Sequence, residues 1–223
     1  MFKLFMFKLF VVLFLICLSP LGFAQEFEID LELGEEINEV CAGCHGEFGE
    51  GGKQGEYPRL AGLPEKYLIE QMKAFKDEKR KNMPMRPYAN ERELPDQDLP
   101  SIAAFLSQLQ LTSKMPKFEE GISAYEKLLI AKKVFNIPKV EGDVALGEKI
   151  YNLECRSCHG RNGLGKEGSD MPQLTGQYTE YMMKQFGQIA RSERPHDDDA
   201  DLFAAMKDKE IQAILAYLSI MDD

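Results

Sequence analysis

The pattern Cys-x-x-Cys-His occurs twice, at residues 41–45 and 155–159, and constrains the fold more than any other feature of the chain. Its spacing suits one porphyrin: the two thiols add to two vinyl groups, and the adjacent histidine is held under the iron as an axial ligand. Zinc ribbons also pair Cys-x-x-Cys motifs, but usually about 15–20 residues apart. A thioredoxin-type pair needs a βαβ context, which is missing around both motifs, and structural disulfides would leave the repeated histidine unexplained. The pattern therefore predicts two covalently attached c-type haems.

The N-terminus has the pattern of a secretory leader. Lys3 and Lys8 precede an apolar run over residues 9–18, and the small residue Ala24 stands before Gln25. We expect a signal peptide over residues 1–24, cleaved after Ala24. The alternative is an uncleaved membrane anchor, for which the apolar run is short. Lipidation at the cysteine inside the run is disfavoured, because a large residue rather than a small one precedes it.

Cysteine use and charge narrow the function further. Of the five cysteines, one lies in the leader and four belong to the two motifs, so the mature chain has no cysteine left over for a disulfide or a nucleophile. Export and covalent haem both place the mature chain outside the cytoplasm, which in this case means the periplasm. The formal net charge is −10, and removing the two leader lysines takes it to −12. Such an acidic chain is a poor nucleic-acid ligand and would be steered towards a basic patch on a partner protein.

The mature chain repeats itself. The cysteines and histidines of the two motifs are 114 residues apart, and several other pairs share that offset, which later shifts once to 112. A constant offset of this kind indicates duplication of a domain of about 85 residues. We therefore expect domain 1 over residues 25–111, a linker over 112–143 and domain 2 over 144–223. The matched pairs are Pro58 to Gly62 with Pro172 to Gly176, Tyr67 with Tyr181, Gln71 with Gln185, and residues 105–107 with 217–219.

Hydrophobic periodicity predicts an all-α chain, since apolar residues recur at helical spacing and no stretch alternates as a strand would. The linker is expected to be partly helical, with an amphipathic helix over residues 125–135 packed against a domain. The expected helices of the two domains cover residues 34–40, 64–79, 95–109, 146–153, 178–190 and 208–221.

Two helical haem-bearing domains in one exported chain resemble the dihaem class I cytochromes c of the cytochrome c4 type. The resemblance implies two tandem domains, each with about three to four helices around one covalent haem; the linker is longer than the family suggests. It also implies that Pro58 and Pro172 offer backbone carbonyls to the second ring nitrogen of each histidine ligand. The implied thioether cysteines are Cys41, Cys44, Cys155 and Cys158, and the implied proximal ligands are His45 and His159.

In such domains the first and last helices cross at a glycine with aromatic contacts. Gly147, with Tyr151 and Tyr217, matches this arrangement in domain 2. In domain 1, Gly34 has the expected aromatic residue near the end of the domain, but Asn38 stands where a second aromatic residue is expected. The crossing in domain 1 is therefore the less regular of the two.

The resemblance further implies a methionine as second axial ligand, from the loop before the last helix. Domain 1 offers Met83 and Met85, and the sequence Arg-Pro-Tyr-Ala after Met85 is most like the ligand loop of the family. We therefore expect Met85 to be the ligand, with Met83 as the alternative. Met72 has helical spacing and is expected in the core.

Domain 2 departs from this pattern, since residues 191–203 contain no methionine. The position of Met85, carried over at offset 112, falls on Asp197, beside His196, the one histidine outside the two motifs. We expect His196 to be the second ligand. The alternatives are Met206, which has a core position at the start of the last helix, and an iron without a second protein ligand. Met182 and Met183 lie on the middle helix and are expected in the core or the haem wall.

These features predict a shuttle that carries electrons between periplasmic or membrane redox partners, in a respiratory chain or in sulfur or iron oxidation. Its expected partners are a membrane oxidase, a quinol–cytochrome c reductase or a dehydrogenase with a basic docking patch; no nucleic acid is expected, and membrane contact only through a partner or an uncleaved leader. The alternative is a haem enzyme, or its electron-transfer subunit, with the second haem as reaction site for a small substrate. A second protein ligand on that iron would favour the carrier.

Overall fold

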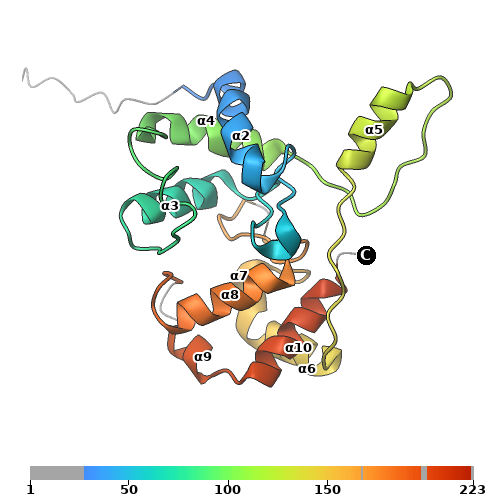
Figure 1. Ribbon diagram of the computed structural model, residues 1–223. Helices are drawn as coiled ribbons and strands as arrows, with labels where there is room; N and C mark the ends of the chain where they lie inside the picture. Colours follow the sequence, from blue (N-terminus) through green and yellow to red (C-terminus); the bar gives the residue numbers. More distant parts are fainter. Residues whose placement is uncertain (1–27, 167, 197–199, 222–223) are drawn as a thin grey trace, which may run out of the picture.

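The computed structural model describes residues 28–166, 168–196 and 200–221, and this part of the chain contains helices and no β-strand (Figure 1). The expected leader, residues 1–24, lies outside the described residues. The helices are α2 (Leu31–His45), α3 (Glu65–Lys76), α4 (Leu99–Gln108), α5 (Ala124–Lys132), α6 (Val144–Ile150), α7 (Arg156–His159), α8 (Thr179–Ala190), α9 (Ala200–Ala205) and α10 (Asp208–Ser219), and the shorter turns are η1 (Lys53–Gly55), η2 (Asp96–Asp98) and η3 (Tyr151–Cys155).

The helices form two domains of the same design, as the internal repeat predicts. In domain 1, α4 packs against both α2 and α3; in domain 2, α10 packs against α6 and α8. The two domains lie against each other, with α8 of domain 2 in contact with η1 of domain 1 (Figure 1). The exact domain boundaries, 25–111 and 144–223, stay a prediction from the repeat.

Both domains begin with an aspartate that caps the first helix. Asp30 Oδ1 accepts hydrogen bonds from the backbone N–H groups of Glu32 and Leu33, at 2.9 and 3.0 Å. In domain 2, Asp143 Oδ1 accepts from the N–H of Leu146 at 3.0 Å. Such caps satisfy N–H groups that have no partner inside the helix and typically stabilise it by about 1 kcal/mol.

The first and last helices of domain 2 cross at Gly147, as expected. A Cβ at this position would collide with the carbonyl oxygen of Ala213 and lie 2.9 Å from Tyr217 Cβ. The ring centroids of Tyr151 and Tyr217 are 5.6 Å apart, and Tyr151 also donates a hydrogen bond of 2.7 Å to the Gly160 carbonyl. The glycine therefore lets two helix backbones meet, and the tyrosine pair fills the space beside them.

The crossing in domain 1 uses a glycine without the second aromatic residue. Gly34 lies against the carbonyl of Ser101 and against Phe105, whose Cβ would be 2.8 Å from a Cβ at Gly34. Asn38 takes the place of Tyr151; it is buried, and its Nδ2 donates to the Glu47 carbonyl at 3.1 Å. A hydrogen bond to the following loop thus replaces an aromatic contact.

Domain 2 has one residue more than domain 1 between the crossing and the haem motif. Seven positions separate Gly34 from Cys41, but eight separate Gly147 from Cys155. The structure absorbs the extra residue in η3, a π-helical turn. Single π-turns of this kind are frequent at functional sites. Because the π-turn takes up the added residue, the glycine crossing and the cysteines both keep their positions.

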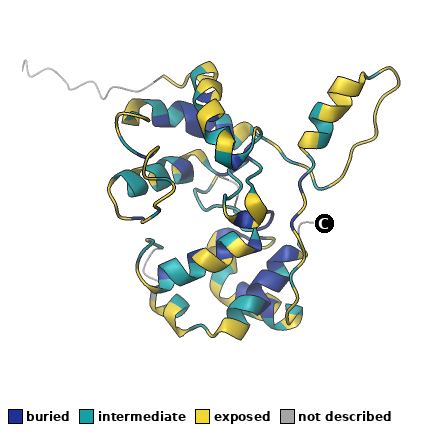
Figure 2. Cartoon of the chain, viewed as in Figure 1, coloured by how far each residue is buried: buried dark blue, intermediate teal, exposed yellow. Residues whose placement is uncertain are grey.

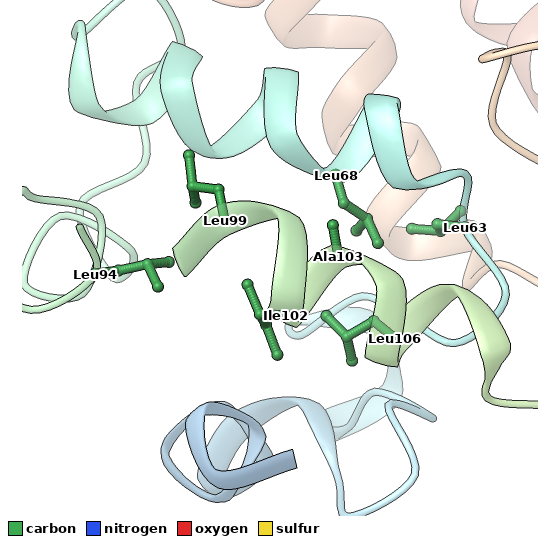
Figure 3. Close-up of a cluster of buried hydrophobic side chains, with 7 residues drawn as sticks. All are labelled: Leu63, Leu68, Leu94, Leu99, Ile102, Ala103 and Leu106. Atoms are coloured by element: carbon green, nitrogen blue, oxygen red, sulfur yellow. The ribbon is translucent and has the colours of Figure 1, made fainter. Parts of the chain in front are cut away.

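Each domain has its own apolar core. In domain 1, aliphatic side chains of α4 interlock with those of α3 and the neighbouring loops (Figure 3). The members are Leu63, Leu68, Leu94, Leu99, Ile102, Ala103 and Leu106 in domain 1, and Tyr151, Met182, Ile214, Leu215 and Leu218 in domain 2. Burying each large aliphatic side chain stabilises the fold by about 1.5–3 kcal/mol.

The linker contains a helix, as expected, but the expected packing of that helix is wrong. Figures 1 and 2 show most of α5 projecting from the body, and the Tyr125 and Leu128 side chains are 68% and 53% exposed. Its C-terminal end contacts domain 1 through an ion pair of Lys132 with Glu47 at 2.7 Å, which is a polar and not an apolar contact. Local hydrogen bonds explain why it forms: Ser123 Oγ accepts from the Glu126 N–H at 3.2 Å, and the Glu126 carboxylate accepts from the Ser123 N–H at 2.8 Å. These bonds lower the pKa of Glu126. A capping box thus replaces the apolar contact.

The linker is attached to the body at its two ends. The N–H of Thr112 donates to the Lys133 carbonyl at 3.0 Å, and the N–H of Phe135 donates to the Thr112 carbonyl at 2.8 Å. The buried Phe135 ring lies edge-on to Tyr178 of domain 2, with centroids 5.3 Å apart. The segment that carries α5 is therefore a closed loop on a fixed base.

Among the residues that the structure describes, no helix is both long and apolar enough to cross a lipid bilayer.

Replacing Gly147 with alanine should destabilise domain 2, because the added methyl group would separate α6 from α10. We expect a loss of roughly 1–3 kcal/mol, measured by thermal and denaturant unfolding of the haem-loaded protein. The matched control is Gly187→Ala in α8, whose new Cβ would meet only the mobile end of the Arg191 side chain. Equal stability of the two variants would contradict a tight crossing at Gly147.

Candidate haem sites

Each haem motif stands at the end of a helix. Helix α2 ends at His45 and α7 ends at His159, and the next residue in each case, Gly46 or Gly160, has a positive φ of 82° or 79°. A positive φ is strained for residues with a side chain, so glycine ends the helix at low cost. In α2 the first cysteine precedes the histidine by four positions, which brings both to one face of the helix.

The two histidines are oriented by the same hydrogen bond. His45 Nδ1 lies 2.9 Å from the carbonyl oxygen of Pro58, and His159 Nδ1 lies 2.9 Å from that of Pro172. Because a carbonyl can only accept, Nδ1 carries the hydrogen, and Nε2 keeps the lone pair that a metal needs. Burial lowers the pKa of His45, which favours the neutral form. The carbonyl contacts expected of Pro58 and Pro172 are present.

The loops that deliver these carbonyls are built alike in both domains. The Gly49 carbonyl accepts the N–H groups of Leu60 and Ala61 at 2.7 and 3.0 Å. The Gly163 carbonyl accepts the equivalent groups of Leu174 and Thr175 at 2.6 and 3.1 Å. Each prolyl carbonyl is therefore held by a loop whose backbone is already hydrogen-bonded, so the histidine meets a fixed acceptor.

None of the four motif cysteines, Cys41, Cys44, Cys155 and Cys158, forms a disulfide, so all four are available for thioether bonds. Burial raises the pKa of the Cys41 thiol, so this group is protonated at neutral pH until it is modified. The state of Cys41 suits thioether formation.

In domain 1 the structure separates the candidate methionines by exposure. The Met83 side chain is 74% exposed, whereas Met85 is partly buried. The Met85 N–H donates to the Asn82 carbonyl at 3.1 Å, and its carbonyl accepts from Ala89 at 2.9 Å, so the residue lies within a hydrogen-bonded turn. Met72 packs against the domain 1 core, as expected. Burial therefore favours Met85, and its role as ligand remains a prediction.

In domain 2 the structure brings His196 close to His159. Their ring centroids are 6.2 Å apart, and the ring planes differ by 28°. The alternative Met206 packs against the domain 2 core, and Met182 is a buried member of it. Met183 on α8 is exposed. The expected neighbour Asp197 lies outside the described residues.

A buried arginine of domain 1 reaches into domain 2. Arg80 is only 5% exposed, and its guanidinium donates to Tyr181 Oη at 2.7 Å and to Gln185 Oε1 at 2.9 Å. It also donates to Gln71 Oε1 of its own domain at 2.7 Å. All three acceptors are neutral, so no carboxylate among them compensates the buried charge.

Arg194 of domain 2 makes the reciprocal contacts. Its guanidinium donates to Tyr67 Oη of domain 1 at 2.7 Å and to Gln185 Oε1 of its own domain at 3.0 Å. Its Nε is a buried donor with no hydrogen-bond partner among the described residues. Leaving a donor on a buried cation unpaired is costly, so this atom is suited to an anion that binds between the domains.

The sequence offset had already paired the tyrosines and glutamines of this network, but not its arginines. Arg80 and Arg194 are also 114 residues apart. Each arginine contacts the glutamine nine positions before it and the tyrosine of the other domain. These matched contacts make this part of the interface approximately two-fold symmetric, and Arg80 departs from the symmetry with its further hydrogen bond to Gln185.

The residues present fit a haem in each domain. Each offers two thiols and a histidine with Nε2 as its metal-binding atom, and domain 2 adds an imidazole at a separation compatible with an iron between the rings. The unpaired Nε of Arg194 adds a buried cationic donor of the kind that a haem carboxylate needs. What sequence reasoning missed is this arginine pair, and the shared offset was the available signal.

Comparisons with known proteins agree with this arrangement. The family described as cytochrome c matches residues 31–110 and 144–222. The chain is 31% identical to a cytochrome c4 of Pseudomonas aeruginosa over 193 residues, which cover 85% of this chain and 87% of the relative. It is 31% identical to a thiosulfate dehydrogenase electron acceptor of Thiomonas intermedia (strain K12) over 182 residues, covering 80% and 77%. The crystal structure of reduced recombinant cytochrome c4 from Pseudomonas stutzeri superposes with a TM-score of 0.66 at 25% identity, covering 86% of this chain and 98% of that one.

Removing either tyrosine hydroxyl from the interface should weaken the contact between the domains. We expect Tyr67→Phe and Tyr181→Phe each to cost about 1–3 kcal/mol, because a buried guanidinium loses an acceptor. Unfolding of the haem-loaded protein measures this, with Tyr57→Phe as control, since that hydroxyl contacts only an exposed lysine at 3.2 Å. If all three variants had wild-type stability, the network would not hold the domains together.

Replacing Met85 with alanine should abolish the weak near-infrared charge-transfer band of a His–Met ferric haem in domain 1. Met83→Ala is the matched control two residues away, and its exposed side chain predicts an unchanged band. Absorption spectra of the oxidised proteins decide between them. A band lost in the Met83 variant but kept in the Met85 variant would reverse the assignment.

Proposed function

The chain belongs to the cytochrome c family and is a dihaem electron-transfer cytochrome, and on that premise we propose that it works as an exported carrier between larger redox proteins. It carries two covalent haem c groups, one at each Cys-x-x-Cys-His motif. Each haem supplies an iron that exchanges one electron at a time. The remaining contributions come from the chain, which attaches, orients and desolvates the two groups.

The observation that carries the proposal is that both domains present their histidine in the same way. His45 and His159 are both buried at a helix end, and each is fixed by a carbonyl at 2.9 Å. A fixed, buried ligand limits the rearrangement that accompanies electron exchange. A catalytic haem would need one site opened to a substrate, whereas His196 lies close to His159 in domain 2.

The interface between the domains supports transfer inside the chain. Arg80, which is buried, and Arg194, which is partly buried, place two guanidiniums between the haem-bearing halves, and we propose that they hold the carboxylates of the two haems. Arg59 and Gln177 add two further hydrogen bonds across the interface, of 3.0 and 2.9 Å. A fixed interface keeps the distance between the two sites constant, so electrons can move between them without domain motion.

We propose the periplasm as the place of action, because residues 1–24 have the pattern of a cleaved leader and the motif cysteines need covalent haem attachment. The proposed partners are a dehydrogenase or quinol–cytochrome c reductase as donor and a membrane oxidase as acceptor. The relative named as a thiosulfate dehydrogenase electron acceptor supports a sulfur-oxidising dehydrogenase among the donors.

The carrier is tested by adding cyanide to the oxidised, haem-loaded protein and following the visible spectrum. A carrier with a protein ligand on both faces of each iron should change slowly, whereas prompt binding at one haem would favour the enzyme. A parallel stopped-flow experiment mixes the oxidised protein with reduced donor protein. Rapid reduction of both haems is expected, and reduction of neither would overturn the proposal.

Electron transfer to a basic partner should slow as salt is added, because the chain has a formal net charge of −10. Raising the ionic strength from about 0.01 to 0.15 M shortens the screening length from about 30 to 8 Å. We expect the second-order rate constant to fall about tenfold or more. An acidic redox protein serves as control, and its rate should rise. A rate with the basic partner that is indifferent to salt would point to apolar docking.

A further inference from the structure

The second axial position in domain 2 is where this chain departs from a methionine-ligated haem. His196 follows α8 in the loop that leads to α9, and its ring centroid lies 6.2 Å from that of His159 with a plane angle of 28°. Two imidazoles bound to one metal from opposite sides, each through a bond of about 2.0 Å, would have centroids about 6 Å apart. The observed separation matches that arrangement.

The His196 ring is held in this position by aromatic contacts. Phe203 of α9 lies edge-on to it, with ring centroids 4.8 Å apart and planes at 67°. Phe203 in turn contacts Phe186 of α8 at 5.3 Å. Phe186 packs against the domain 2 core, so a chain of rings connects His196 to the folded body. The imidazole is thus positioned by packing from two helices.

The methionines of domain 2 lie at positions other than the ligand loop. Those on α8 and near α10 pack in the core or are exposed to solvent, and Met171 directly precedes Pro172, whose carbonyl contacts His159. They are Met171, Met182, Met183, Met206 and Met221.

We propose that His196 is the second axial ligand in domain 2, so that the chain carries one His–Met haem, in domain 1, and one His–His haem, in domain 2. The inference rests on the proposed carrier function and deepens it. A thioether ligand raises the potential of a haem relative to a second imidazole. The domain 2 site therefore has the lower potential, and an electron that enters there moves to domain 1. The difference in potential between the two haems therefore sets the direction of electron flow within the carrier.

The wild-type protein alone provides the first test. In the oxidised, haem-loaded protein, the near-infrared band should have the intensity of one His–Met haem per chain, and EPR should show a second, low-spin bis-imidazole species. A redox titration should resolve two one-electron steps. A band with the intensity of two His–Met haems, or a high-spin signal from half of the iron, would overturn the assignment without any variant.

Variants at His196 provide the second test. His196→Ala should convert one haem to high spin and shift the lower step of the titration while the upper step is unchanged, and added imidazole should restore the low-spin spectrum. His196→Met should double the near-infrared band and raise the lower step. The matched control is Arg191→Gln at the start of the same loop, an exposed side chain that pairs with Glu193 at 2.9 Å. This variant should leave spectra and potentials as in the wild type.

The outcomes separate this inference from the carrier function. Low-spin iron in both domains after His196→Ala, with unmoved titration steps, would exclude His196 as a ligand. If the iron in question proved to be His–Met, the carrier would stand and only the His–His assignment would fall. Prompt cyanide binding by the wild-type protein would contradict both the carrier function and the assignment of His196 as a ligand.

Discussion

The hydrogen bond from each histidine to a prolyl carbonyl is the contact on which the rest of the molecule depends. It decides which ring nitrogen carries the hydrogen, and so which atom is left for iron. It forms because α2 ends at His45 beside a glycine in the left-handed region, and because the Gly49 carbonyl fixes the loop that carries Pro58. Helix capping, the glycine crossing and the core all serve to place one imidazole against one carbonyl.

Within this shared frame the two domains have diverged at selected positions. The buried Asn38 stands where domain 2 has Tyr151, and one extra residue in domain 2 is absorbed by the π-turn η3. Neither change moves the histidine–carbonyl contact, which measures 2.9 Å in both halves. Duplication therefore preserved the part that orients the metal ligand while the helix contacts around it varied. The proposed second axial position, Met85 in domain 1 and His196 in domain 2, belongs to the variable part.

Sequence patterns predicted those features that depend on local spacing. The motifs, the proline pair and the main helices follow from residue types at fixed intervals, and the structure has them.

The arginine pair was missed because charged residues are expected on the surface, although Arg80 and Arg194 share the offset of the repeat. The packing of α5 was predicted wrongly: Leu128 has helical spacing but is exposed, and the helix is stabilised at its start by the capping box at Ser123. The π-turn could have been inferred from the different spacing of Gly34 and Gly147 to their cysteines.

The arginine network also affects the potentials of the two haem sites. A buried positive charge favours the reduced, less positive state of a nearby iron and raises its potential. Arg80 and Arg194 contribute one guanidinium from each domain, and each donates to a tyrosine of the other domain, so both charges lie between the two halves. Charge at the interface therefore shifts both potentials in the same direction. The proposed exchange of a thioether for the His196 imidazole acts on one domain alone, so it is a change that can separate the two potentials.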